Sequence, residues 1–360
     1  MRVALVCPYS LSVPGGVQGQ VLGLAHALRA DGHAVRIVAP TDGPPPEPGV
    51  FSVGPTRRLR TNGSVAPIAP GKETADRTLE ALRTFAPDVI HLHEPLVPGP
   101  THAALLAAEV PLVGTFHAAG SQSLYRRMTK PARRALGRLT VRTAVSEQAR
   151  LLVRQALGGT YWVIPNGVEV TRFVKAVPWP RRRPSIFFVG RHEERKGLEV
   201  LLDAFSMLEV DAELWVAGDG PQTAALRARR IPDVQWLGRI SDDELARRMR
   251  GATVFCAPSL YGESFGIVLL EGMVSGAAVV ASAIPGYADV ARADREALLF
   301  PPGDALGLAH ALRTVLTDHE LRGRLVAAGE LRGAEFSMER LAQRFLPVYE
   351  SALARGRAES

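Results

Sequence analysis

The N-terminal stretch MRVALVCPYSLSVPGGVQGQVLGLAHALRADGHAVRIVAP, residues 1–40, predicts the fold class of the chain. It starts with an apolar run at 2–6, passes through a glycine-containing turn at 14–17, and then carries apolar residues at helical spacing over 19–33. A second apolar run follows at 34–39. This order of strand, turn, helix and strand is a crossover unit, the building block of a parallel sheet.

The same alternation of short apolar runs and helical patterns continues to the end of the chain. The further runs lie at 88–94, 111–117, 142–146, 161–167, 185–191, 212–220, 234–239, 253–259, 277–282 and 297–302. The proline- and arginine-rich segment KAVPWPRRRP, residues 175–184, has no periodic pattern and reads as a linker. We therefore predict two doubly wound, Rossmann-like α/β domains at 1–168 and 185–340, joined by a linker at 169–184.

Composition restricts the class of protein. The chain has 360 residues, of which 46% are hydrophobic and 22% charged, so two domains can bury cores and disorder is excluded as the main state. Cys7 and Cys256 lie in apolar runs and are too few for a disulfide framework, which favours a reduced, cytoplasmic enzyme. No run reaches the ~20 apolar residues of a spanning helix, and residues 1–10 read as a strand and not as a signal peptide.

The net charge of +7 is distributed unevenly. Residues 1–165 carry 18 basic and 10 acidic side chains, whereas residues 166–360 carry 25 and 26. This asymmetry predicts an acidic partner for the first domain, either a phospholipid surface or nucleic acid. Nucleic acid is the less favoured partner, because the most basic segment, 126–154, offers only Tyr125 for base stacking.

The basic segment also has an amphipathic pattern at helical spacing. Its apolar side carries Met128, Ala132, Ala135, Leu136 and Leu139. Such a helix suits an anionic membrane surface, although its apolar side could equally pack on the domain with the arginines in water. The predicted membrane-surface residues are Arg126, Arg127, Lys130, Arg133, Arg134 and Arg138.

Two loops carry residues suited to a diphosphate. Gly15 and Gly16 lie between the first strand and the first helix, where backbone N–H groups can approach a phosphate, although an ordinary tight turn explains them equally well. Arg191 and Lys196 follow the strand SIFFV five residues apart, so both can reach a diphosphate at the sheet edge. A solvated basic loop is the plain alternative for this second pair.

The most specific motif is GESFGIVLLE, residues 262–271, between a strand and a helix. Glu263 in the loop and Glu271 in the helix can both accept hydrogen bonds from hydroxyl groups, which suits a sugar and a ribose. A pair of glycosidase carboxylates about 5 Å apart is the rival interpretation, and the open α/β architecture argues against it. We also find no DxD motif, no Cys/His cluster and no HxxxH motif, so no metal and no other cofactor is expected.

Taken together, the motifs resemble a known enzyme family. PGGV, a TFH strand end, IPNGVE, GR…KG, AGDGP and GESFGIVLLEGMVSGAAVVAS are similar to those of retaining glycosyltransferases of the GT-B fold, family GT4. Within that family, CPYS…VPGGVQ, NGSVA at 62–66, HLHEP and CAPSLYGESFGIVL most resemble the phosphatidyl-myo-inositol mannosyltransferases, which use GDP-mannose. The resemblance implies two domains with the active site in an interdomain cleft, and a final helix, 341–360, that crosses back to the first domain.

The resemblance also implies roles for individual residues. Arg191 and Lys196 would hold the diphosphate, Glu263 the transferred sugar, and His117 would reach that sugar from the first domain; these four are the expected catalytic residues. Glu271 would hold the ribose and backbone near Ile240 the base. The expected donor-binding set is completed by Gly15, Gly16, Ser264, Phe265, Gly266 and Ile267. The expected acceptor-binding residues, on the inositol side, are Tyr9, Gln18, Asn62 and Ser64.

Three positions depart from the mannosyltransferase pattern. Pro67 stands where those enzymes have an arginine, Ala118 where they have a threonine, and Gln122 where they have a lysine. Each of the expected groups would contact the acceptor or its phosphate, so the identity of the acceptor stays open at this point. Arg57, Arg58 or Arg60, just before the NGSVA loop, could supply a replacement cation.

The resulting hypothesis is a monomeric, retaining mannosyltransferase. It would act on an inositol phospholipid while bound peripherally to the inner face of the plasma membrane, with an anionic membrane surface as its partner and without nucleic acid. One alternative is a GT4 enzyme with another nucleotide sugar and a different glycolipid or soluble acceptor. The other is a non-enzymatic module that binds a sugar nucleotide or a lipid on the same fold.

Overall fold

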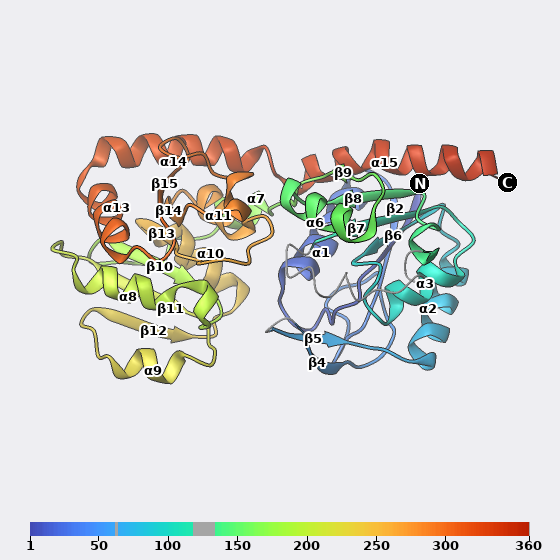
Figure 1. Ribbon diagram of the computed structural model, residues 1–360, viewed down its shortest axis with the longest axis horizontal. Helices are drawn as coiled ribbons and strands as arrows, with labels where there is room; N and C mark the ends of the chain where they lie inside the picture. Colours follow the sequence, from blue (N-terminus) through green and yellow to red (C-terminus); the bar gives the residue numbers. More distant parts are fainter. Residues whose placement is uncertain (62–63, 118–133, 360) are drawn as a thin grey trace. The chain divides into compact units, whose positions relative to one another are not determined.

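The computed structural model describes residues 1–61, 64–117 and 134–359, and the chain divides into two compact units (Figure 1). The first unit consists of Met1–Gly167 and Met338–Ser360, and the second of Val168–Ser337. Each unit contains a parallel sheet with helices on both faces. The predicted fold class, two doubly wound α/β domains, is confirmed.

The sheet of the first unit has the strand order β3-β2-β1-β6-β7-β8-β9, and all of its neighbouring strands run parallel. The order reverses direction between β1 and β6, which is the point where doubly wound sheets bind ligands. The strands are β1 (Arg2–Val6), β2 (Ala34–Ala39), β3 (Val50–Ser52), β6 (Val89–His93), β7 (Leu112–Phe116), β8 (Val141–Ala144) and β9 (Trp162–Val163). A separate antiparallel pair consists of β4 (Arg57–Thr61) and β5 (Ser64–Ile68).

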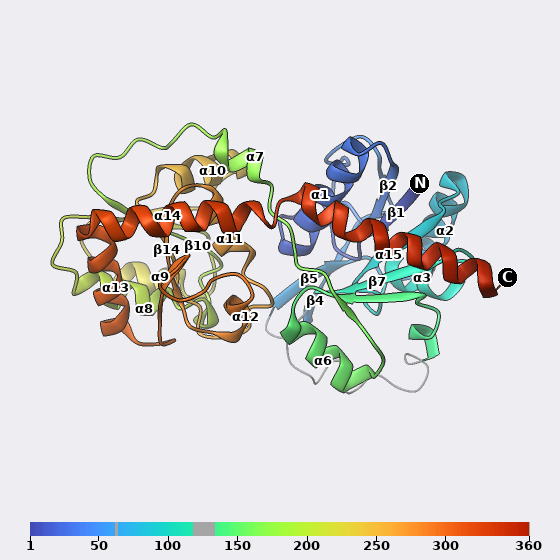
Figure 2. The same ribbon diagram turned by 90° about the horizontal axis from the view of Figure 1, so that it is seen from above.

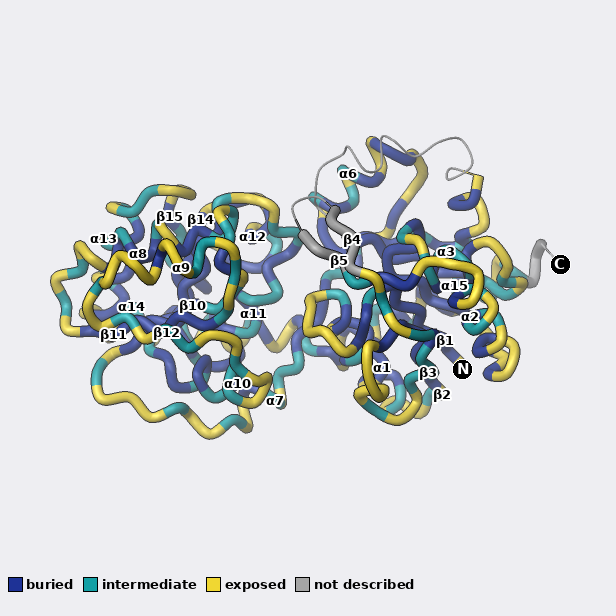
Figure 3. The backbone as a smooth tube through the Cα atoms, turned by 90° about the horizontal axis from the view of Figure 1, so that it is seen from below, coloured by how far each residue is buried: buried dark blue, intermediate teal, exposed yellow. Residues whose placement is uncertain are grey.

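Helices cover both faces of this sheet because its central strands present apolar side chains to both faces. Val3 and Leu5 of β1 pack in one core with α1 and α15, whereas Ala4 and Val6 pack in the other with α2, α3 and α6. Figure 3 shows the central strands of this sheet in the colour of buried residues. The helices are α1 (Gly16–Ala30), α2 (Lys72–Phe85), α3 (Pro100–Ala107), α6 (Glu147–Leu157) and α15 (Met338–Glu359).

The second unit repeats the plan with the strand order β12-β11-β10-β13-β14-β15, again parallel throughout. The strands are β10 (Ser185–Val189), β11 (Glu213–Ala217), β12 (Val234–Gly238), β13 (Val254–Ala257), β14 (Ala278–Ser282) and β15 (Ala297–Phe300). The helices are α7 (Val170–Val174), α8 (Leu198–Ser206), α9 (Thr223–Ala228), α10 (Asp242–Gly251), α11 (Ile267–Val274), α12 (Pro285–Ala288), α13 (Ala305–Thr317) and α14 (His319–Ala334).

The segment predicted as a linker, 169–184, belongs to the second unit. Helix α7 buries Phe173 and packs against α10 and α11. Beyond it, Trp179 donates its backbone N–H to the Arg247 carbonyl at 2.8 Å, and the Arg248 guanidinium lies 4.0 Å from its ring centroid. Residues 169–184, predicted as a linker, are thus held against the second unit, because one aromatic side chain anchors an otherwise aperiodic segment.

The final helix begins earlier than predicted and lies in the first unit. α15 starts at Met338, not at residue 341, and packs along α1 (Figure 2). Its apolar stripe includes Leu341, Phe345 and Val348, all buried in the core that α1 shares with the sheet.

A buried glutamine on α1 holds the backbone at Gly167, where the chain leaves the first unit. The Gln20 side chain on α1 donates to the Gly167 carbonyl and accepts from the Gly167 N–H, both at 2.7 Å. Gln20 is almost completely buried, so loss of its amide leaves two polar backbone groups without their partner.

We expect Gln20→Ala to lower the free energy of unfolding of the first unit by about 1–3 kcal/mol, because two buried backbone groups lose their partner. The measurement is the melting temperature by circular dichroism, with Gly19→Ala as the control. A Cβ at the exposed Gly19 meets no atom within 4 Å, and alanine is the better helix former, so this change should leave the melting temperature unchanged or raise it slightly. Equal melting temperatures for wild type and Gln20→Ala would contradict the role of this contact.

Candidate functional site

At the carboxyl edge of the second sheet, two loops meet at unusually close range. The loop after β10 contains Arg191 and a short 3-10 helix, Glu194–Lys196, and ends at Gly197 with φ = +66°. A Cβ at Gly197 would lie 1.9 Å from the Pro258 carbonyl oxygen, so only glycine permits this approach. The Leu260 N–H donates to the Arg195 carbonyl at 2.8 Å and joins the two loops.

This approach places Lys196 against Glu263. The Lys196 Nζ lies 2.6 Å from Glu263 Oε1, Arg195 Nη1 lies 3.6 Å from the same oxygen, and Ser259 Oγ donates to it at 2.9 Å. Burial acts to raise the pKa of Glu263, but the two cations and the hydroxyl outweigh burial and hold that pKa below its ordinary value. Glu263 is therefore an ionised, fixed hydrogen-bond acceptor.

Arg191 and Lys196, predicted as a pair, have different surroundings. Lys196 is engaged by Glu263, whereas the Arg191 side chain is 44% exposed and forms an ion pair with Glu193 at 3.7 Å. Arg191 is thus available to a charged ligand at the sheet edge. Sequence reasoning missed Arg195, which lies beside Glu263 although it belongs to the same short basic loop.

The segment after Glu263 is held by a glycine and an aromatic contact. Gly266 has φ = +88°, and a Cβ there would lie 2.7 Å from the Tyr287 ring. Phe265 is buried against Phe336, with ring centroids 5.7 Å apart. Ile267 is the first residue of α11, so the half-buried Ser264 and Ile267 lie at the N-terminal end of that helix. This end of α11 offers the positive end of the helix dipole to an anion.

Glu271, one turn further along α11, has the opposite electrostatic environment to Glu263. Burial raises its pKa to about 7, Arg172 lowers that value, and Asp242 and Glu169 raise it. Its charge is thus incompletely compensated. The carboxyl group is partly protonated near neutral pH, and in either form it can hydrogen-bond to a diol.

The predicted base-binding position lies beside another sheet-edge loop. Ile240 follows β12 and is half-buried, and Ser241 caps α10 by accepting from the Glu244 N–H at 3.1 Å. Nearby in the fold, Thr223 and the Gly220 N–H bind Asp219 and lower its pKa. These contacts order the loops on both sides of the Gly218–Gly238 backbone hydrogen bond.

In the first unit, His117 follows β7 at the carboxyl edge of the sheet, as predicted from its position in the sequence. It is 8% exposed. Its Nε2 lies 2.9 Å from His93 Nδ1, and its backbone N–H donates to Glu94 Oε1 at 2.7 Å. Burial lowers the pKa of His117 to about 3, with Asn166 acting in the opposite direction. His117 is therefore a neutral hydrogen-bonding group at physiological pH, not a cation.

Two further histidines extend inward from His117. His93 stacks on His91 with ring centroids 4.3 Å apart, and His91 bonds to Tyr349 of α15 at 2.9 Å and to Thr115 at 2.6 Å. A small cavity of about 10 Å³, the space of one water molecule, adjoins His93, His117 and other residues of this unit. The sequence motif HLHE thus forms one side of a buried polar chain.

The glycine turn and two predicted acceptor residues lie together near β1. Gly15 caps α1 and Gly16 is its first residue. Gln18 is buried and donates to the Ser10 carbonyl at 3.4 Å, while Tyr9 pairs with Ile68 as an isolated bridge. Burial raises the pKa of Tyr9, so its hydroxyl stays protonated.

Several predicted positions lie outside the described residues. These are Asn62, Ala118, Gln122, Arg126, Arg127, Lys130 and Arg133. Ser64 lies in β5. Pro67, also in β5, accepts from the Ser10 N–H through its carbonyl at 3.1 Å.

The described end of the basic segment packs onto the first unit. Ala135, Leu136 and Leu139 are buried in the core with α3 and α6. Arg138 donates to the Leu105 and Ala108 carbonyls at 2.8 and 2.6 Å, and so satisfies the end of α3. Arg134 is exposed. Over residues 134–139, the apolar side of the predicted amphipathic pattern is therefore part of the domain core.

We expect Glu271→Gln to stabilise the second unit more at pH 8 than at pH 5. A carboxyl group whose folded-state pKa is raised becomes destabilising as pH rises from about 4.5 toward 7, and glutamine carries no charge at any pH. The gain at pH 8 should be about 1–3 kcal/mol, read from melting temperatures. Glu320→Gln, at an exposed position on α14, is the control. An equal effect of Glu271→Gln at both pH values would exclude the raised pKa.

The family to which the chain belongs follows from its relatives. The family model for Glycosyltransferase Family 4 matches residues 14–172, and the one for glycosyl transferases group 1 matches residues 170–332. A phosphatidyl-myo-inositol mannosyltransferase of Mycobacterium tuberculosis is 38% identical, with 99% of this chain and 98% of that protein covered. One from Propionibacterium freudenreichii is 36% identical, with 91% of each covered.

Solved structures agree on the fold. Sucrose-phosphate synthase from Thermosynechococcus elongatus superposes with a TM-score of 0.77 and 22% identity, covering 98% of this chain and 99% of that one. At this identity the likeness concerns the fold alone, which is GT-B. With both family models and full-length relatives above 30% identity, the chain belongs to the GT4 family and is a glycosyltransferase.

Proposed function

We propose that this enzyme transfers mannose from GDP-mannose to a phosphatidyl-myo-inositol-type lipid at a membrane surface. The observation that carries the proposal is 38% identity over 99% of the chain to an enzyme named for that reaction. Among the described residues, no helix has the length and apolar character needed to cross a bilayer. We propose that the enzyme associates with the membrane peripherally, on its inner face.

The proposed donor site lies at the carboxyl edge of the second sheet. Negative charge grows on the diphosphate as the bond to the sugar breaks, and the exposed Arg191 is placed to stabilise it. Lys196 serves the same charge while holding Glu263, whose carboxylate accepts from a sugar hydroxyl. We propose that these groups act without a metal ion, so that a chelator leaves turnover unchanged.

The proposed chemistry retains the anomeric configuration of the sugar. The acceptor hydroxyl attacks on the face that the diphosphate leaves, and the departing diphosphate accepts the hydroxyl proton. His117 fits this scheme as a neutral hydrogen-bonding partner of the sugar, because its low pKa removes it as a cation or a strong base.

The first unit is the proposed acceptor unit. It carries the whole excess of basic side chains, and Tyr9 and Gln18 lie together beside the first glycine turn. Pro67 supports an alternative, another glycolipid or a soluble acceptor, because proline supplies no cation for a lipid phosphate. The exposed Arg57, which starts β4, is a candidate replacement.

Incubation with GDP-mannose and anionic vesicles should give a mannosylated lipid only when the vesicles contain phosphatidylinositol. Proton NMR of the product should show the α anomer, as in the donor. Vesicles of the same charge without phosphatidylinositol are the control. Vesicle binding without product would reject the inositol acceptor, and an inverted anomer would reject the retaining chemistry.

Arg191→Ala should lower kcat about 10- to 100-fold and change GDP-mannose affinity much less, because the guanidinium opposes charge that develops mainly in the transition state. Arg191 is a cleaner target than Lys196, whose removal would also leave Glu263 without its nearest cation. Arg324→Ala, an exposed change on α14, is the matched control. An equal loss of affinity and turnover would show uniform binding of the diphosphate instead.

A further inference from the structure

A chain of two hydroxyl groups ends on the Glu263 carboxylate, on the same oxygen that Lys196 and Arg195 contact. Tyr287 Oη donates to Ser259 Oγ at 3.0 Å, and Ser259 Oγ donates to Glu263 Oε1 at 2.9 Å. Tyr287 and Ser259 are 1% and 3% exposed. Ser259 precedes the GESFGIVLLE segment and Tyr287 follows it, and neither was among the expected site residues.

The direction of these hydrogen bonds follows from the number of protons available. An ionised Glu263 can only accept a hydrogen bond, so Ser259 donates its single hydroxyl proton to the carboxylate. Ser259 then has lone pairs left and accepts from Tyr287. Burial raises the pKa of Tyr287, which keeps its proton available for this bond. The chain is therefore ordered from Tyr287 through Ser259 to Glu263, and each hydrogen bond orients the next one.

The contacts of Glu263 are unequally divided between its two oxygens. In the part of the chain that the structure describes, Lys196, Arg195 and Ser259 all contact Oε1. Three groups on one oxygen fix the rotation of the carboxylate about its terminal bond. Oε2 is left with its acceptor capacity for a hydroxyl of the ligand.

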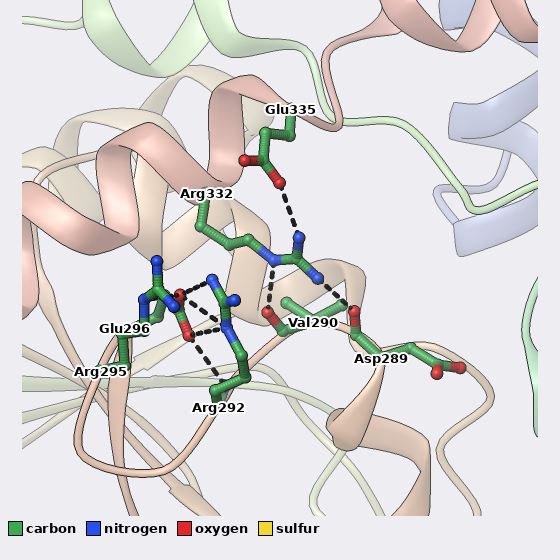
Figure 4. A network of polar contacts seen from close by, with 7 residues as sticks. All are labelled: Asp289, Val290, Arg292, Arg295, Glu296, Arg332 and Glu335. Atoms are coloured by element: carbon green, nitrogen blue, oxygen red, sulfur yellow. Dashed lines mark hydrogen bonds and ion pairs between the residues drawn. The ribbon is translucent and has the colours of Figure 1, made fainter.

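The backbone that carries Tyr287 packs directly against the backbone of Glu263. Tyr287 lies on α12, and a Cβ at the preceding Gly286 would lie 2.0 Å from the Glu263 carbonyl oxygen, so the two backbones are in direct contact. Arg332 of α14 donates to the Asp289 and Val290 carbonyls at 2.8 and 3.1 Å, just beyond α12 (Figure 4).

An ion pair between Arg292 and Glu296 holds the loop that follows α12. Glu296, 1% exposed, binds the side chain and the backbone N–H of Arg292 (Figure 4). Arg332 and the Arg292–Glu296 ion pair therefore hold the segment that directly follows α12, the helix that carries Tyr287.

We propose that Ser259 and Tyr287 are positioning residues, which orient Glu263 so that one carboxylate oxygen faces a hydroxyl of the transferred sugar. The inference rests on the proposed role of Glu263 as the sugar-binding carboxylate. It adds a reason why this enzyme would discriminate between sugars. A carboxylate oxygen held in one orientation disfavours a nucleotide sugar whose hydroxyl lies elsewhere on the ring.

The test compares Ser259→Ala and Tyr287→Phe with wild type, using GDP-mannose and phosphatidylinositol vesicles. We expect kcat to fall about tenfold in Ser259→Ala and about threefold in Tyr287→Phe. The double variant should be no worse than Ser259→Ala alone, because both residues act through the same hydrogen bond. Ser185→Ala removes a buried hydroxyl that lacks a hydrogen-bond partner among the described residues of this unit, and it should retain wild-type kcat.

The pH profile separates positioning from simple packing. Ser259 helps to lower the pKa of Glu263, so in Ser259→Ala the acid limb of kcat/KM should move to higher pH. A purely structural role would lower the melting temperature and leave this limb in place. An unmoved limb, or losses that multiply in the double variant, would overturn the inference.

A binding measurement keeps the inference testable without turnover. Melting temperatures are measured with GDP-mannose or UDP-glucose, whichever stabilises the wild type, and with the matching nucleotide diphosphate alone. The extra rise in melting temperature that the sugar gives over the nucleotide should be smaller in both variants and in Glu263→Gln. If the wild type itself produces no mannolipid, the proposed function fails while this measurement stands. If only Glu263→Gln loses the shift, Glu263 binds sugar but the two hydroxyl residues do not position it.

Discussion

The close approach of two loops at Gly197 is the constraint on which the candidate donor site depends. The glycine lies against the Pro258 carbonyl, and a side chain at that place would push the basic loop away from the loop after β13. Lys196 precedes this contact and Ser259 follows it, so the same approach brings a cation and a hydroxyl to one oxygen of Glu263. A buried carboxylate without such partners would become protonated and lose its value as an acceptor.

The two glutamates of the GESFGIVLLE segment show how position on one short element separates chemical roles. Glu263 lies in the loop, where Lys196 and Arg195 hold its pKa low. Glu271 lies on α11, where burial raises its pKa to about 7 and Arg172 compensates it only in part. A fixed anion and a carboxyl group that gains or loses a proton near neutral pH therefore come from the same ten residues. The difference is produced by neighbours from other parts of the second unit.

The same principle applies to the first unit, where burial determines the chemistry of a strand-end histidine. His117 is surrounded by β6, β7 and the stacked His93, and its pKa falls to about 3. The neutral ring suits hydrogen bonding to a polyhydroxylated ligand and does not suit pairing with a phosphate. His91, His93 and His117 of this unit are all buried, whereas Arg57 and Arg134 are exposed.

The sequence by itself determined the alternation of strands and helices, the two doubly wound units and the family. It also placed His117, Arg191, Lys196 and Glu263 in segments that follow strands, because parallel sheets bring those ends to one edge. It placed Glu271 on the helix that comes next. It did not reveal that residues 169–184 pack on the second unit, since aperiodic composition does not show that Trp179 contacts two arginines of α10. Only the tertiary structure decided which partners each site residue has. Ser259 and Tyr287 are 28 residues apart, and no periodicity or local motif connects them. Hydrogen-bond partners from separate crossover units are set by how α12 packs under the loop of Glu263, which is a property of the folded unit and not of any segment of the chain.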